Sequence, residues 1–220
     1  PIFADIDVPP LEVADAAANF PGISEALLRL HGAYLREQSA LAEQRVAGGG
    51  HEGGDPVAEA RRFVAAQRNY FDGLDTRAEE LSAEIAVAGG AEPWLNARGV
   101  RVRFLPDDVL MNSIRRFDRH NEQLLIDDGL DRASRAYQLA VHIAYTAMRG
   151  EISAVVRGAS FASETAANLV RRALGGYGAA ALLMPYGLFA QAVEARRYDV
   201  EALGRQFGAS FEQVAHRLTT

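Results

Sequence analysis

The stretch RASRAYQLAVHIAYTAMRG, residues 132–150, decides the fold of this chain. It reads as a helix over residues 131–149 that carries His142 at its centre and Tyr145 three residues later. On either side of it the sequence changes character, because the preceding segment has the alternating period of strands and the following segments return to helical spacing. Working outward from this helix therefore gives the order of the elements.

Three short strands are predicted before the helix. Residues 100–104, VRVRF, alternate in polarity and place Arg101 and Arg103 on the face opposite the apolar residues. SIRRF (113–117) and EQLLID (122–127) read as two further strands, and DRHN between them has the composition of a turn. We predict a small antiparallel sheet of about three strands.

Helices fill the rest of the chain. An N-terminal helical segment over residues 1–50 is followed by a glycine-rich loop that contains His51. Asp55 and Pro56 are a helix N-cap and a first-turn proline, and one apolar face continues from them to about residue 88, with Gly73 as a possible bend. Further helices are predicted over these ranges: 160–184, 186–197 and two short helices within 198–220.

The predicted fold class is therefore α+β, mostly helical with one small sheet. We expect two parts, an N-terminal helical segment over residues 1–50 and a second domain over residues 55–220.

Composition excludes several kinds of chemistry. The 220 residues include no cysteine, which excludes disulfides, cysteine nucleophiles and iron–sulfur ligation within this segment. The net charge of −6 argues against a generic nucleic-acid binder. No apolar run approaches the length of a membrane span, and we expect a cytoplasmic protein. All 23 basic residues are arginines, which reflects either a GC-rich genome or sites for phosphate or carboxylate groups.

The central helix lacks a metal-binding pair. Zinc peptidases of the H-E-x-x-H type place two histidines at positions i and i+4, and the glutamate beside the first acts as general base. Here Thr146 stands four residues after His142, so this pair cannot chelate zinc. From the residues alone, His142 is either a hydrogen-bonded structural histidine or part of a ligand site that includes Arg149.

Four blocks carry a resemblance to a known family. They are RRFVAAQRNYFDGLDTRAEELS (61–82), LAVHIAY (139–145), GGYGAAALLMPYGLF (175–189) and RYDVEALGRQFGASFEQVAHRLTT (197–220). In this order the chain resembles the sensor region of the short-chain fatty-acyl transcriptional regulators, in particular the mycobacterial branch that controls propionate catabolism. The resemblance implies that residues 55–220 form a degenerate zincin-like, ligand-sensing domain related to the ImmA/IrrE metallopeptidases, and that residues 1–50 lead to it from a DNA-binding domain outside this sequence.

The resemblance also implies that the metal site is lost. The first zinc histidine falls on Val141, the general-base glutamate on His142, the second histidine on Tyr145 and the third ligand on Leu174. Valine and leucine do not bind zinc. We therefore expect no zinc and no enzymatic activity, and the alternatives are a zinc-dependent peptidase or hydrolase of the same fold and a purely structural dimerisation module.

A peptidase groove without its metal would leave an apolar cavity, and the family implies a short-chain acyl-CoA, such as propionyl-CoA, as its ligand. Arginines are expected to hold the phosphates of the CoA, with a solvated charged face as the alternative interpretation of each cluster. The candidate ligand-binding residues are Arg68, Asn69, Tyr70, Arg101, Arg103, Arg115, Arg116, Val141, His142, Tyr145, Arg149, Leu174 and Tyr177, with Arg61 and Arg62 as further candidates for the phosphates.

The expected partners are the acyl-CoA effector, a second copy of the chain, and DNA bound through a helix-turn-helix domain outside this segment. The segment EALGRQFGASFEQVAHRL also has the pattern of a helix-turn-helix, with glycine in the turn and Ser210 as a helix cap. It is not strongly basic, and we interpret it as structural. No iron–sulfur cluster is expected within these residues.

Overall fold

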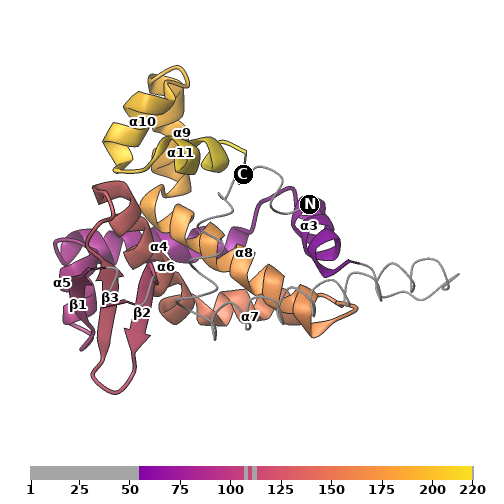
Figure 1. Ribbon diagram of the computed structural model, residues 1–220. Helices are drawn as coiled ribbons and strands as arrows, with labels where there is room; N and C mark the ends of the chain where they lie inside the picture. Colours follow the sequence, from indigo (N-terminus) through magenta and orange to yellow (C-terminus); the bar gives the residue numbers. More distant parts are fainter. Residues whose placement is uncertain (1–54, 107–108, 111–112, 220) are drawn as a thin grey trace, which may run out of the picture. The chain divides into compact units, whose positions relative to one another are not determined.

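The computed structural model describes residues 55–106, 109–110 and 113–219 (Figure 1). The helices predicted within residues 1–50, the loop with His51 and the proposed boundary near residue 50 lie outside the described residues.

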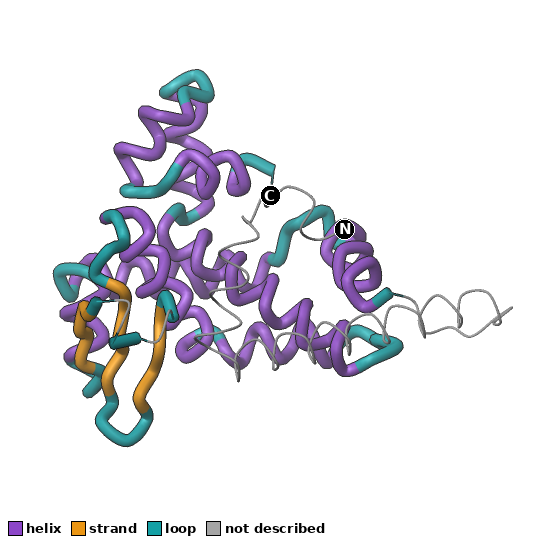
Figure 2. Tube along the Cα trace, in the orientation of Figure 1, coloured by secondary structure: helices purple, strands orange, loops and turns teal. Residues whose placement is uncertain are grey.

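The described residues are mostly helical, with one three-stranded sheet, which confirms the predicted fold class (Figure 2). The strands are β1 (Arg101–Leu105), β2 (Arg115–Asp118) and β3 (Gln123–Asp127). The helices are α3 (Pro56–Ala66), α4 (Asp72–Val87), α5 (Ala91–Asn96), α6 (Arg132–Ala147), α7 (Arg149–Arg157), α8 (Glu164–Leu183), α9 (Tyr186–Ala195), α10 (Val200–Phe207) and α11 (Phe211–Arg217).

The prediction of one continuous helix from residue 55 to residue 88 is wrong. Asp55 caps α3 as expected, because its carboxylate accepts the backbone N–H of Val57. However, the helix ends at Ala66, and Arg68 and Asn69 both adopt left-handed backbone conformations, with φ of 55° and 56°. Two such residues in succession cannot continue a right-handed helix. The chain therefore turns before α4 begins, ahead of the bend that we expected at Gly73.

The sheet is mixed, so the prediction of an antiparallel sheet is wrong for one of its two pairings. The strand order is β1-β3-β2, with β1 parallel to β3 and β2 antiparallel to β3. Only β2 and β3 are joined by a tight turn, in which Asp118 accepts backbone N–H groups from His120 and Asn121. Alternating polarity shows which face of a strand is buried, but it does not encode the direction of its neighbour.

Helix α8 is the centre of the core. It packs against α3, α4, α6, α7 and α11, and ten of its twenty residues are buried. Two glycines allow α6 to approach closely: an added Cβ at Gly175 would lie 2.4 Å from the Tyr145 ring, and one at Gly178 would lie 3.1 Å from the Met148 sulfur. On its other side α6 contacts β3, where Leu124 and Ile126 are fully buried.

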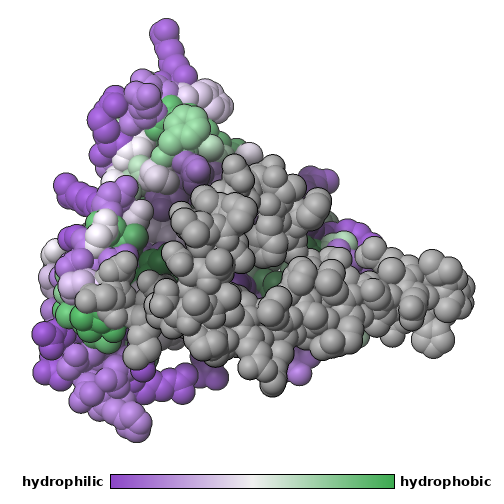
Figure 3. All heavy atoms as spheres, in the orientation of Figure 1, coloured by the Kyte–Doolittle hydropathy of each residue, from purple (hydrophilic) through white to green (hydrophobic). Residues whose placement is uncertain are grey.

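Helix α7 was missed by the sequence patterns, since a glycine lies in its first turn and another follows its last residue. The last helices, α9–α11, surround a smaller apolar cluster that includes Met184, Phe189, Leu203 and Val214. Ser210 caps α11 and forms a full capping box with Gln213. On the face shown in Figure 3, the described surface is mostly hydrophilic, with separate hydrophobic patches.

Among the described helices, none is both long and apolar enough to cross a bilayer by itself, although the bent pair α8 and α9 passes on length and composition together.

Candidate functional site

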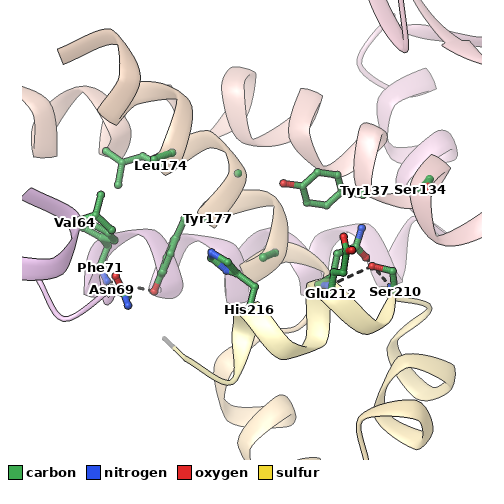
Figure 4. Close-up of a pocket in the computed structure, with 14 residues that line it drawn as sticks. Val64, Asn69, Phe71, Ser134, Tyr137, Leu174, Tyr177, Ser210, Glu212 and His216 are labelled. Atoms are coloured by element: carbon green, nitrogen blue, oxygen red, sulfur yellow. Dashed lines mark hydrogen bonds between the residues drawn. The ribbon is translucent and has the colours of Figure 1, made fainter. Parts of the chain in front are cut away.

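A cavity of about 500 Å³ lies between α8, the first turns of α6, the α3–α4 turn and α11 (Figure 4). Its walls are mainly apolar, but several polar side chains also line it. The apolar lining includes Val64, Phe71, Ala173, Leu174 and Tyr177, and the polar lining includes Asn69, Ser134, Tyr137, Ser210, Glu212, Gln213 and His216. This combination of an apolar surface with a few polar groups is typical of a small-molecule site.

Tyr177 is held rigidly at the wall of this cavity. Its hydroxyl donates a hydrogen bond to Asp75 and accepts the backbone N–H of Phe71 at 3.3 Å. The Phe71 ring meets the Tyr177 ring edge-on, with centroids 5.2 Å apart. Burial, followed by the hydrogen bond to Asp75, raises the pKa of Tyr177 to about 12, so the phenol stays protonated as a donor.

Asp75 also joins the cavity wall to the last helix. The side chains of Asp75 and Arg217 form an ion pair, and the two residues are only 4% and 2% exposed. The Nε of Arg217 donates to the carbonyl oxygen of Met184 at 3.2 Å. Side chains from α4, α8 and α11 therefore meet in one buried polar network, which fixes the position of α11 against the cavity.

Helix α11 supplies the polar side of the cavity. Figure 4 shows Glu212, Ser210 and His216 of α11 and its cap lying across the cavity from Val64 and Leu174. The Ser210 hydroxyl accepts the backbone N–H of Gln213 as a cap, and the Gln213 side-chain oxygen accepts the backbone N–H of Ser210, whereas His216 and Glu212 line the cavity without a part in this capping box. On the opposite side, the Asn69 side chain donates to the carbonyl oxygen of Thr219 at 3.3 Å.

One face of α6 carries Val141 and Tyr145, which the family resemblance aligns with two zinc ligands of the metallopeptidases. Tyr137 lines the cavity, and Val141 and Tyr145 follow it at intervals of four residues on the same face. The Tyr145 ring lies over Gly175, and its hydroxyl donates to the carbonyl oxygen of Arg172 at 3.4 Å. Tyr145 and half-buried Val141 are therefore next to the cavity, but they do not line it.

His142 lies on a different face of α6. Its ring packs against Phe117 of β2 with centroids 4.7 Å apart, and its Nε2 is buried with no hydrogen-bond partner. Burial, followed by the nearby Arg115 charge, lowers the pKa of His142 to about 4, so the imidazole is neutral at ordinary pH. His142 lines a separate cavity of about 420 Å³ together with Trp94 and Thr146, and it is not grouped with Leu174 and Tyr177.

The residues at the three expected zinc-ligand positions do not fit a metal. Val141 and Leu174 are hydrocarbon side chains, and Leu174 is fully buried. The Tyr145 hydroxyl is engaged with a backbone carbonyl. Within the part of the chain that the structure describes, no three His, Cys, Asp or Glu residues are grouped so that they could hold a metal ion. The donor set that zinc requires is therefore not provided by these residues.

The structure brings together only some of the residues predicted to bind the ligand. Asn69, Leu174 and Tyr177 line the cavity. Arg68 is exposed and directly precedes Asn69, whereas exposed Tyr70 donates to Asp72 and meets the Tyr186 ring edge-on. The remaining arginines do not line it: these are Arg61 and Arg62 on α3, Arg101 and Arg103 on β1, Arg115 and Arg116 on β2, and Arg149 on α7.

Arg115 has a structural contact of its own. Its guanidinium is half-buried and donates to the carbonyl oxygen of Gln138 at 3.2 Å, which ties the edge strand β2 to α6. Burial lowers the pKa of Arg115.

Several cavity residues were missed from the sequence. Phe71 lies within a quoted family block, but its role was not singled out. Glu212 and His216 belong to a segment that was interpreted as purely structural, and their approach to α8 depends on contacts between residues far apart in the sequence.

Comparison with known proteins places this chain near a family of peptidase-like domains and near bacterial transcription regulators. The IrrE N-terminal-like domain family matches residues 95–219. The chain is 32% identical to the HTH-type transcriptional regulator RamB of Mycobacterium tuberculosis over 98% of its own length and 48% of that protein. It is 34% identical to the regulator PrpR of the same organism over 75% of the chain and 35% of that protein. It is 32% identical to the propionyl-CoA carboxylase regulator of Cereibacter sphaeroides over 100% and 48%.

A solved structure of a Mycobacterium tuberculosis transcriptional regulator has a TM-score of 0.70 and 32% identity, and the match covers 76% of this chain and 52% of that one. The chain spans about half the length of the RamB and propionyl-CoA carboxylase regulator sequences that it matches. Because the family match extends from α5 through α11 and includes the altered metal-site helix, the chain belongs to the IrrE N-terminal-like domain family.

Proposed function

We propose that this chain is the ligand-sensing part of a bacterial transcription regulator and that its effector is a short-chain acyl-CoA such as propionyl-CoA. The observation that carries the proposal is the cavity of about 500 Å³ beside the altered peptidase helix, with Leu174 and Tyr177 in its wall. The similarity to proteins that are named as regulators, one of them for propionyl-CoA carboxylase, supports the regulatory role.

The cavity suits an acyl group for a physical reason. Val64, Phe71 and Leu174 offer apolar surface, and each methylene that is removed from water contributes about 0.8 kcal/mol. A thioester carbonyl needs a hydrogen-bond donor, and Tyr137 and His216 are lining residues that can donate one. The phosphates of CoA would remain near the surface, where Arg68 and Arg172 directly adjoin the lining residues Asn69 and Ala173.

We propose no peptidase or hydrolase activity and no zinc, because Val141, Tyr145 and Leu174 provide no donor set at the family's ligand positions. The expected result of metal analysis on the purified chain is less than stoichiometric zinc. Stoichiometric zinc that is lost on replacing His142 would show that the helix has been misinterpreted.

The decisive experiment is calorimetric titration of the whole 220-residue chain with acetyl-, propionyl-, butyryl- and free CoA. Arg68→Gln should weaken every CoA ligand, because a hydrogen bond to a charged phosphate contributes about 1.5–3 kcal/mol, or roughly ten- to a hundredfold in affinity. Arg103→Gln on β1 is the matched control, with the same change of charge away from the cavity. Raising the salt concentration should weaken the phosphate contribution.

A second variant tests where the acyl chain lies. Ala173→Leu places additional volume in the cavity wall and should disfavour butyryl-CoA relative to acetyl-CoA, while free CoA changes little. Ala86→Leu, at an exposed position of α4, is the control. The proposal fails if no CoA compound binds the chain, and the placement fails if Ala173→Leu weakens all ligands equally.

We further propose that the whole regulator is a cytoplasmic homodimer that contacts DNA through a helix-turn-helix outside these residues. Dimeric regulators of this type read two half-sites, and a ligand shifts such a protein only if it binds its two states with different affinity. Sedimentation at high concentration tests whether this segment carries part of the dimer interface; a monomer would assign dimerisation to other parts of the protein.

A further inference from the structure

A second cavity, of about 820 Å³, lies on the other side of α6, where α6 meets β1, α5 and the ends of α4 and α8. Its walls include Ile85, Phe104, Leu139, Ile143 and Leu182, which are apolar. It shares no lining residue with the cavity of about 500 Å³, although α6 and α8 contribute to both. The proposed acyl-CoA function does not use it.

Two arginines make this cavity different from an ordinary packing gap. Arg132 and Arg135, both on α6, line it, and among the residues that the structure describes Glu92 is the only acidic one in the lining, so the described lining has a formal charge of +1. Within the part of the chain that the structure describes, neither arginine forms an ion pair with a carboxylate. The site therefore has positive charge that its own acidic residue does not neutralise.

The contacts of Arg135 leave one buried nitrogen of its guanidinium group unpaired. Its guanidinium lies over the Phe104 ring, 4.9 Å from the ring centroid, and its Nη2 donates to the carbonyl oxygen of Asp128. Its Nε is buried and has no hydrogen-bond partner among the residues that the structure describes. A buried donor without a partner is costly, and the cost is larger for a charged group. The Phe104 contact holds the guanidinium plane in place beside the apolar wall.

We propose that this cavity binds an aliphatic monocarboxylate of medium chain length. The carboxylate would accept hydrogen bonds from Arg135 and Arg132, since the guanidinium fork matches the two carboxylate oxygens. A single negative charge balances the formal +1 of the described lining residues, whereas a doubly charged phosphate group would exceed it. The hydrocarbon tail lies along Leu139, Ile143 and Leu182.

The test is direct titration of the full 220-residue chain with hexanoate, octanoate and decanoate, and with decanol as a neutral ligand of the same tail. Affinity should rise by up to about fourfold for each added methylene until the cavity is filled. Decanoate should bind at least about tenfold more tightly than decanol, because decanol lacks the charge that the arginines recognise. Equal binding of decanol and decanoate, or no binding of any of these compounds, overturns the proposal.

Variants assign the binding to these residues. Arg135→Gln should weaken decanoate by about ten- to a hundredfold, and Arg132→Gln, at an exposed position, gives a second variant that tests the proposal without a buried change. Arg157→Gln, exposed at the end of α7, is the matched control and should bind decanoate as the unaltered chain does. Equal losses in Arg132→Gln and Arg157→Gln would show a nonspecific charge effect and refute the site.

The same titrations separate this proposal from the acyl-CoA proposal. Arg68→Gln should weaken propionyl-CoA and leave decanoate binding unchanged, and Arg132→Gln should do the reverse. Decanoate binding that is lost in Arg68→Gln and retained in Arg132→Gln would place the carboxylate in the first cavity and overturn the second site.

Discussion

Removing the charge of Arg217 is the sharpest test of how the candidate site is built. Arg217 is 2% exposed and pairs with Asp75, which is 4% exposed and also accepts the Tyr177 hydroxyl. Arg217→Met removes one charge and leaves a buried carboxylate without its partner. Breaking a buried pair in this way costs about 3–5 kcal/mol. For a protein of this size the corresponding decrease in Tm is about 6–20 °C.

The measurement is the free energy of unfolding in urea, together with the Tm, for Arg217→Met, Asp75→Asn and the double variant. Asp75→Asn retains one oxygen that can accept the Tyr177 hydroxyl, but its Nδ2 replaces the oxygen that accepts from Arg217, so this variant loses the charge and one acceptor. Because the double variant buries no unpaired charge, its cost should be about 1–3 kcal/mol less than the sum of the single costs.

An exposed ion pair provides the control. Arg205 and Glu201 lie 3.7 Å apart on α10, with side chains 71% and 80% exposed, and Arg205→Met should cost less than about 1 kcal/mol. If Arg217→Met costs no more than Arg205→Met, or if the double variant is additive, the description of the Asp75–Arg217 pair as a buried network is wrong.

Three further predictions follow from individual residues. Folding lowers the pKa of His142 from 6.5 to about 4, so the unfolded state binds more protons than the folded state between pH 6.5 and pH 4. The free energy of unfolding should therefore decrease by about 3 kcal/mol as the pH falls through this range. His142→Gln should reduce this pH dependence of unfolding. Gly175→Ala should displace Tyr145 and lower the Tm, whereas Gly175→Ala combined with Tyr145→Ala should recover part of the loss; an unchanged Tm in the single variant would contradict the close approach. Ser210→Ala should cost about 1 kcal/mol of unfolding free energy through the lost cap of α11, and Ser210→Asp should retain most of it.

The sequence predicted those features that depend on neighbouring residues. Asp55 begins α3, and Ser210 caps α11, because a cap needs only one side chain and the backbone within three residues of it. Residues 100–104 were correctly interpreted as a strand, because alternating polarity is also a property of neighbouring residues. The break after Ala66 was missed, since the left-handed conformations of Arg68 and Asn69 carry no glycine or proline signal.

The candidate site was only partly predictable. Leu174 and Tyr177 were expected in one site, and both line the cavity of about 500 Å³, since they lie three residues apart on α8 and share a face. His142 was expected in the same site, but its position on α6 directs it toward Phe117 instead. Glu212 and His216 could not be found from spacing, because they reach the cavity from a helix that lies far beyond Tyr177 in the sequence.

By itself, then, the sequence determined the fold class, the order of the strands and of most helices, and the lack of an H-E-x-x-H pair on the central helix, all of which follow from residue type and local period. Only the tertiary structure decided which side of α6 each residue occupies and which cavity it lines. It also decided that β1 runs parallel to β3, and that Asp75, Tyr177 and Arg217 meet. These features depend on the close packing of helices and strands that are far apart in the sequence, which excludes water from between them. A local sequence pattern does not predict such non-local packing.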